Sequence, residues 1–180
     1  MSLFHSDAFL AFRSRDFSLL SVNQLCLILA IMIQEVVIAY SVYQLTQNPL
    51  SLGMIALIEL LPFICLSLIS GDWADRYNRQ KIVQWSFSCS TLIPLLFIVL
   101  FSQYQQQHIQ QNTLLCGIYS LIFCLGILRG IYSPSFNSLR PFLTPESAYS
   151  NAATWTALIW HMGGILAPLC AGLLLGQLGL

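Results

Sequence analysis

Five long apolar runs, separated by short polar segments, organise the chain. They lie at residues 19–43, 50–70, 82–101, 113–135 and 152–174. Each is about 20 residues or longer, which an α-helix needs to cross the hydrocarbon core of a bilayer. A barrel needs short alternating segments, and a strand edge facing lipid leaves its backbone groups unsatisfied. The pattern predicts an all-α polytopic membrane bundle of five transmembrane helices at residues 19–180, after an N-terminal segment at residues 1–18.

Composition supports a membrane protein and excludes several other classes. Hydrophobic residues make up 57% of the chain, above the roughly 45 to 50% of soluble domains. Seven basic residues balance seven acidic ones, so net charge gives no reason to expect nucleic acid as a partner. The six cysteines lie inside apolar runs without ligand spacing. Because the common enzyme motifs are also missing from the sequence, we expect no enzyme activity, cofactor or metal site.

The basic residues predict how the chain is oriented in the membrane. The polar segment 71–81 holds five of the fourteen formal charges, and it separates the second and third apolar runs. Six basic residues fall on one side of the predicted membrane: Arg13, Arg15, Arg76, Arg79, Lys81 and Arg140. The loops on the other side carry none. By the positive-inside rule, the N-terminus and the segment 71–81 are expected in the cytoplasm.

Four ionisable residues fall inside the apolar runs: Glu35, Glu59, Arg129 and His161. Such residues are costly in a bilayer, so each is a candidate for proton or substrate handling. Glu35 and Glu59 are expected at a similar depth, on the order of 12 to 14 Å below the outer surface. If they face each other, they can share a proton, because two carboxylates do not both ionise easily at low dielectric. Alternatively, each is a single carboxyl that faces a water-filled cleft or bonds to neighbours such as Gln34.

The two other intramembrane groups also have more than one interpretation. Arg129 lies six residues from the cytoplasmic end of the fourth run, so its side chain can reach the headgroups or form a structural ion pair. Contact with an anionic substrate or a carboxylate is the alternative. His161 lies near the middle of the fifth run, where a hydrogen-bonded histidine competes with a ligand or a proton relay.

Small residues repeat every four positions along the fifth run. They form two ridges: Gly163, Ala167 and Ala171, and Gly164, Pro168, Gly172 and Gly176. Small residues at this spacing allow helix backbones to approach closely. Both ridges are therefore predicted to pack, and Pro168 is expected to kink its helix.

The segment 71–81 resembles the loop between helices two and three of the major facilitator superfamily, G-x-L-A-D-R-x-G-R-[RK]-[RK]. The matching residues are Gly71, Ala74, Asp75, Arg76, Arg79 and Lys81. Trp73 replaces the leucine, Asn78 the second glycine and Gln80 one basic residue. By this resemblance Asp75, with Arg76 and Arg79, is a latch of the cytoplasmic gate, in a gating loop that also contains Gly71 and Lys81.

Further segments resemble the exporters of this superfamily. Gly163, Ala167, Pro168 and Gly172 are similar to the antiporter signature G-x-x-x-G-P-x-x-x-G, with alanine for one glycine. Four further segments resemble enterobactin-type and macrolide-type exporters. They are residues 15–20 with Gln24, and residues 43–46, 61–62 and 129–134. The small residues expected early in the first run are replaced by residues 28–31, Ile-Leu-Ala-Ile.

The resemblance implies a secondary active transporter in a bacterial inner (plasma) membrane. Its expected function is proton-coupled efflux of a small amphipathic molecule, a drug or siderophore, by alternating access. The partners are then the substrate, protons and the lipid bilayer. Family members have twelve spans in two six-helix halves, whereas five are predicted here. The alternative is a truncated or split transporter, or a small membrane scaffold subunit, that does not transport without a separate C-terminal half.

Overall fold

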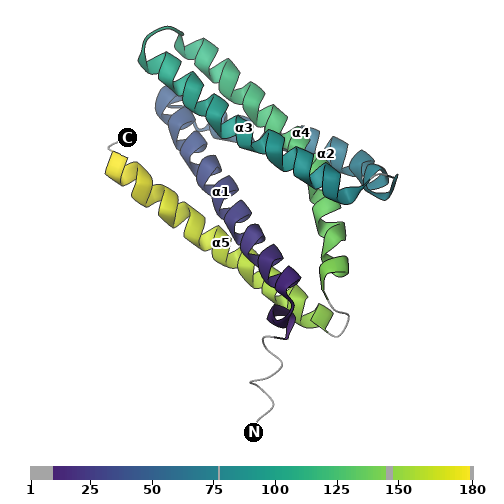
Figure 1. Cartoon of the computed structure of the whole chain (residues 1–180). Coiled ribbons are helices and arrows are strands. Elements are labelled where there is room, and N and C mark those ends of the chain that lie inside the picture. Colours follow the sequence, from purple (N-terminus) through teal and green to yellow (C-terminus); the bar gives the residue numbers. More distant parts are fainter. Residues whose placement is uncertain (1–9, 77, 145–147, 179–180) are drawn as a thin grey trace. The chain divides into compact units, whose positions relative to one another are not determined.

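The computed structural model describes residues 10–76, 78–144 and 148–178, with all their side chains except those of residues 73–75, 79, 139–143 and 178. A short 3-10 helix, η1 (Ala11–Arg13), precedes five α-helices (Figure 1). These are α1 (Arg15–Thr46), α2 (Leu50–Arg76), α3 (Arg79–Gln105), α4 (Gln111–Leu143) and α5 (Tyr149–Leu178). In the described part of the chain there is no strand, which confirms the predicted all-α class.

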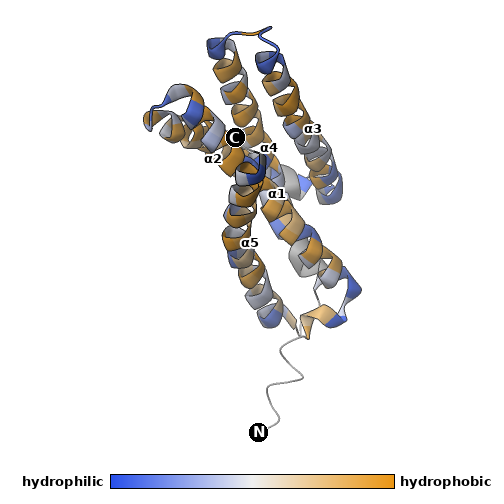
Figure 2. Cartoon of the chain, turned by 90° about the vertical axis from the view of Figure 1, so that its left-hand side faces the viewer, coloured by the Kyte–Doolittle hydropathy of each residue, from blue (hydrophilic) through white to orange (hydrophobic). Residues whose placement is uncertain are grey.

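All five α-helices are long and apolar enough to cross a membrane. Hydrophobic residues cover most of each helix, while hydrophilic residues gather at the helix ends and connections (Figure 2). Each helix is longer than the apolar run that predicted it; α1, for example, has 32 residues. Hydropathy detects only the part inside the hydrocarbon, whereas a helix continues through the interfacial region, where its backbone bonds remain satisfied.

The polar segment 71–81 differs from the predicted loop, because most of it is helical. Helix α2 continues through Arg76, and α3 already begins at Arg79. The last turn of α2 carries an ion pair between Arg76 Nε and Asp72 Oδ2, 3.0 Å apart. At the start of α3, the Asn78 side chain accepts hydrogen bonds from the amides of Gln80 and Lys81. This N-cap satisfies amides that have no partner inside the helix, so α3 can begin at once.

Turn chemistry also sets the connection between α1 and α2. Gln47 adopts a left-handed φ of 49°, which ends α1. The Leu50 amide then donates to Asn48 Oδ1 at 3.0 Å, and Pro49 directly precedes α2. Proline lacks an amide hydrogen and has a φ suited to a helix start, so it is tolerated here. The connection between α1 and α2 is therefore confined to residues 47–49.

The chain forms two compact units, residues 1–38 with 140–180, and residues 39–139. In the first unit, η1 packs on the beginning of α5. Ala11, Phe17, Ala148 and Ala152 form a buried cluster. The Ala11 amide donates to Asn151 Oδ1 at 3.2 Å, and the rings of Phe12 and Trp155 meet edge to face at 5.0 Å. These contacts fix the segment before α1 against α5.

The second unit contains α2, α3 and most of α4. Gly117 of α4 lies against Leu100 of α3, where an added Cβ would be 2.9 Å from Leu100 Cδ1. Towards the other end of the same helix pair, the Phe87 ring lies 5.2 Å from that of Tyr132. Leu114, Ile118 and Ile122 continue the packed face of α4 and are at most 2% exposed. The same face of α4 continues to Gly126, which contacts α2.

Candidate functional site

Helices α2 and α4 cross at very close range, at a contact that we call the α2–α4 seam. On α4 it contains Gly126, Arg129 and Gly130, and on α2 it contains Glu59, Pro62, Phe63, Leu66 and Ser70. A Cβ at Gly126 would overlap the Glu59 carbonyl oxygen and lie 2.7 Å from Pro62 Cγ. At Gly130 it would lie 3.0 Å from the Phe63 carbonyl oxygen. Only glycine allows this approach of two backbones.

A buried hydrogen bond joins α2 and α4 at the Gly130 end of the seam. Ser70 Oγ donates to the Gly130 carbonyl oxygen at 2.6 Å, and the Ser70 side chain is 2% exposed. In hydrocarbon, a serine hydroxyl needs such a partner, because no water is available. The bond therefore fixes the register of α2 against α4 next to the neighbouring Arg129.

An intramembrane ion pair joins the two helices within the seam. Arg129 Nη1 donates to Glu59 Oε1, which is also a salt bridge. The Arg129 side chain is 25% exposed and the Glu59 side chain 16% exposed. Each charge neutralises the other where water is scarce, and this offsets part of the cost of placing both inside a span. The pair is therefore stable only while both groups stay charged and close together.

The Arg129 side chain reaches away from the nearer end of its span. Arg129 is nine residues before Ser138, the last residue of the span in α4, or about 14 Å. Its partner Glu59 lies beside Gly126, almost one turn closer to the start of α4. Of the predicted alternatives, the structure shows an ion pair with a carboxylate, that of Glu59.

The other two intramembrane candidates belong to the first unit. Glu35 lies on α1 and His161 on α5, and both side chains are exposed. Glu59 belongs to the second unit, so the pairing of Glu35 with Glu59 stays a prediction. What the structure does assign is a partner for Glu59, namely Arg129.

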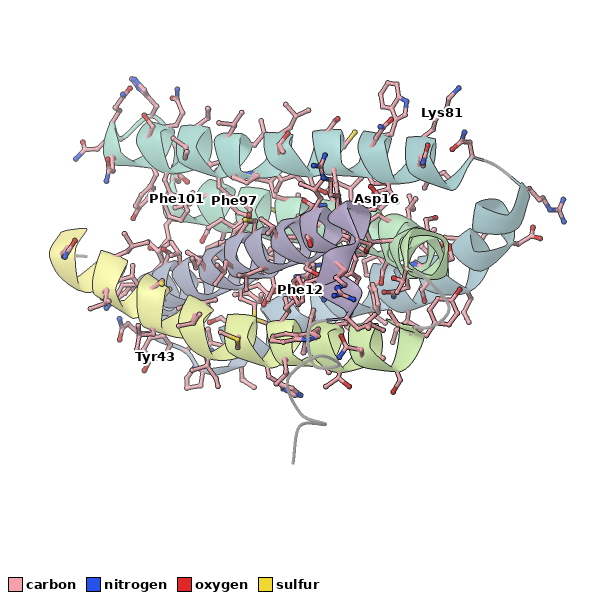
Figure 3. The ribbon with its side chains drawn as sticks, turned by 60° about the horizontal axis from the view of Figure 1, so that its bottom comes forward. Phe12, Asp16, Tyr43, Lys81, Phe97 and Phe101 are labelled. Atoms are coloured by element: carbon pink, nitrogen blue, oxygen red, sulfur yellow. The ribbon has the colours of Figure 1, made fainter. Side chains whose placement is uncertain are left out.

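The gating residues lie at the junction of α2 and α3. Gly71 and Arg76 are in the last turns of α2, and Arg79 and Lys81 are in the first turn of α3. Lys81 is exposed, and its side chain points away from α3 (Figure 3). The side chains of Asp75 and Arg79 lie outside the described residues, so the latch assignment stays a prediction.

Within the first unit, one of the two predicted ridges of α5 packs closely against α1. A Cβ at Gly163 would overlap Ile28 Cγ2 of α1, and Ala167 and Ala171 are fully buried. Along the second ridge, a Cβ at Gly172 would meet nothing within 4 Å, and Pro168 is exposed. The two ridges have the same small-residue spacing, so the difference arises from which face of α5 meets α1.

The sequence-based prediction missed the glycines of the seam. Gly126 and Gly130 are four residues apart and form the same small-xxx-small signal that identified the ridges of α5. Their proximity to Arg129 in the sequence was a further indication. Ser70 gave no comparable signal, because a serine near a helix end commonly bonds to its own helix.

Comparisons with known proteins agree with this architecture. The family model described as Major Facilitator Superfamily matches residues 20–180. A "Staphyloferrin A transporter" of Staphylococcus aureus is 25% identical over 128 residues, which is 71% of this chain and 31% of that protein. Two Bacillus subtilis proteins, "Uncharacterized MFS-type transporter YkuC" and "Uncharacterized MFS-type transporter YfiS", are 29% and 24% identical over 59% and 77% of this chain.

The chain spans only about a quarter to a third of the length of these relatives, 31%, 23% and 30%. No solved structure matches it. The family match covers all five apolar helices, including the seam and the segment 71–81. The chain is therefore an integral membrane protein that belongs to the Major Facilitator Superfamily.

Proposed function

We propose that the chain is part of a proton-coupled exporter of a small amphipathic molecule, a drug or a siderophore, that works by alternating access. The observation that carries this proposal is the ion pair between Glu59 and Arg129 inside the α2–α4 seam. Membership of a family whose relatives are named as transporters supports it. Charged residues are rare inside membrane spans and mark pathways of ions or substrates.

In this proposal Glu59 carries the proton. When Glu59 is protonated it no longer neutralises Arg129, so the guanidinium is left charged in a poorly hydrated site. The protein then favours a conformation in which Arg129 meets water or another anion, and this couples proton uptake to a conformational change. Glu35 is the alternative carrier, because it is the second carboxyl inside an apolar helix.

The segment 71–81 is proposed to act as the cytoplasmic gate. Its sequence resembles the family loop, with Asp75 as the latch and Arg76 and Arg79 as its basic partners, in a loop that also contains Gly71 and Lys81. Only residues 77 and 78 separate α2 from α3. The loop residues at the end of α2 and at the start of α3 are therefore close along the chain, which suits a latch. The proposed location is a bacterial inner membrane, which rests on the likeness to bacterial relatives. The N-terminus is proposed to be cytoplasmic, which the placement of the basic residues supports.

Transport is proposed to require spans beyond the five in this chain, in a continuation or in a separate C-terminal half. The small share of each relative's length that the chain covers supports this. It also favours a second candidate function, in which the chain is a transporter fragment or a small scaffold subunit without transport activity of its own. The two candidates differ in whether the complete gene product moves a substrate.

The test uses the complete gene product in lipid vesicles, with ethidium as an amphipathic probe and an imposed pH gradient. We expect ethidium flux that depends on the gradient. Glu59→Gln should uncouple this flux, because the amide neither takes up a proton nor carries a charge. Glu35→Gln tests the alternative carrier. The matched control is Glu146→Gln, which removes a carboxylate outside the five apolar runs and should leave coupling intact.

Two outcomes would refute parts of the proposal. If Glu59→Gln and Glu35→Gln both keep full gradient-driven flux, then neither carboxyl carries the proton. If the complete product moves neither ethidium nor other amphipathic dyes under any gradient, the scaffold or fragment function is the better conclusion.

A further inference from the structure

Helix α3 has two clearly different faces. One face is buried in the second unit and repeats every three or four residues, at Val83, Ser86, Ile93 and Phe97. The opposite face is exposed and largely apolar. Its large residues are Trp85 at 74% exposed, Leu92 at 56%, Leu96 at 48% and Val99 at 54%. An apolar face of this kind on a membrane-spanning helix can accept lipid acyl chains.

The exposed stripe matches the thickness of a bilayer and is bounded by polar residues. Lys81 precedes it and Gln103 follows it, and both are exposed. These two residues are 22 positions apart, or about 33 Å along a helix, against about 30 Å for the hydrocarbon core. Trp85 lies one turn inside Lys81, about 6 Å deeper. That is where indole rings concentrate, at the membrane–water interface.

The two ends of the stripe differ in charge. Lys81 is a cation at one end, and its side chain points away from α3 (Figure 3). The last turn of α3, at the other end, carries no basic residue. An ammonium group at headgroup level attracts anionic lipid, while an uncharged end has no such preference. Lys81 and Trp85 are four residues apart and therefore lie on the same side of the helix.

We propose that Lys81 and Trp85 bind the headgroup of an anionic phospholipid, with its acyl chains along Leu92, Leu96 and Val99. The Lys81 ammonium would meet the lipid phosphate, and the Trp85 indole would lie at the glycerol level below it. The large apolar residues Leu92, Leu96 and Val99 of the stripe favour a membrane lipid over a free anion. This inference does not depend on the proposed transport function.

The experiment measures lipid preference next to Trp85. A variant with W73F, W155F and W160F keeps Trp85 as the single tryptophan of the 180-residue chain, in bilayers of phosphatidylcholine and phosphatidylglycerol. One lipid at a time is brominated, and quenching of Trp85 reports which lipid is its neighbour. We expect about a fivefold preference for phosphatidylglycerol at low salt, the size of one lysine near an anionic surface. Lys81→Gln should remove it.

The matched control moves the charge along the same helix. Lys81→Gln combined with Gln103→Lys has the net charge of the parent, but its lysine lies at the other end of the stripe, so the preference at Trp85 should stay absent. If the triple variant does not fold, native mass spectrometry compares bound phosphatidylglycerol between the unmodified chain and Lys81→Gln, which should retain less. An equal preference in the parent and in Lys81→Gln would overturn the proposal. So would loss of the preference on adding 10 mM inorganic phosphate at matched ionic strength, which would indicate a free-anion site.

Discussion

Substitution of Gly126 by alanine tests whether backbone contact holds the α2–α4 seam together. The added Cβ would overlap the Glu59 carbonyl oxygen and lie 2.7 Å from Pro62 Cγ. A carbon normally stays about 3.3 to 3.6 Å from a carbonyl oxygen. Neither the backbone oxygen nor the proline ring can rotate away. The two helices must therefore separate by about 1 Å at this point.

The cost follows from that separation. Overpacking a tight contact costs about 1 to 3 kcal/mol, and a 1 Å gap removes a quarter to a half of the dispersion energy of the contacts along it. Because the Glu59 backbone cannot move aside, we expect the cost of Gly126→Ala to be about 3 kcal/mol, the upper end of this range. Alanine regains about 1 kcal/mol of helix propensity over glycine. The net expectation is a loss of about 2 kcal/mol in the free energy of unfolding, or about thirtyfold in the equilibrium constant.

The assay is equilibrium unfolding of the purified chain in mixed micelles, followed by circular dichroism during a titration with dodecyl sulfate. Gly172→Ala is the matched control, because its Cβ would meet nothing within 4 Å, and it should be neutral or slightly stabilising. Gly163→Ala should fall between the two, since its Cβ meets the Ile28 side chain rather than backbone. Equal effects of Gly126→Ala and Gly172→Ala would refute the reasoning.

Three further predictions concern the ion pair, the N-terminal contact and the gate. Arg129→Leu should cost about 2 to 3 kcal/mol of stability in the same titration, which is less than a fully buried pair would give, because this pair is partly exposed. Adding Glu59→Leu should restore most of the lost stability. A double variant less stable than Arg129→Leu would contradict a paired charge. Asn151→Ala should weaken the attachment of η1 to α5, so hydrogen exchange of the Ala11 amide should accelerate at least several-fold, whereas unchanged exchange would show that another contact protects it. Asp75→Asn in the complete gene product should cut ethidium flux at least tenfold while dye binding persists, and unchanged flux would remove Asp75 from the gate.

Much of the fold was predictable because hydropathy identifies the segments that are apolar enough to cross a membrane. The five apolar runs correspond to the five long helices. The helix ends at residues 71–81 were predicted less well. Local interactions set both helix ends there: the Asp72 to Arg76 pair lies in the last turn of α2, and the Asn78 cap begins α3. These act on a helix already outside the hydrocarbon, where hydropathy carries no information.

The candidate site was predictable only as a set of residues. Spacing identified Glu59 and Arg129 as costly charges inside spans, but not that they would meet, because one-dimensional spacing does not fix the rotation of one helix against another. Their meeting depends on Gly126 and Gly130, which bring α4 close to α2. The two ridges of α5 illustrate the same limit, since within the first unit equal spacing gave one ridge packed against α1 and one that is not.

The sequence by itself determined that the chain crosses a membrane with five helices, because the cost of exposing polar groups to hydrocarbon depends on composition along the chain alone. It also determined which side chains are costly enough to need a partner. The tertiary structure decided that two of them, Glu59 and Arg129, are partners. Glu59 neutralises Arg129 because two glycines, a proline and one serine hydrogen bond set the distance and register of α2 against α4. That geometry is a property of two packed helices and is absent from either one alone.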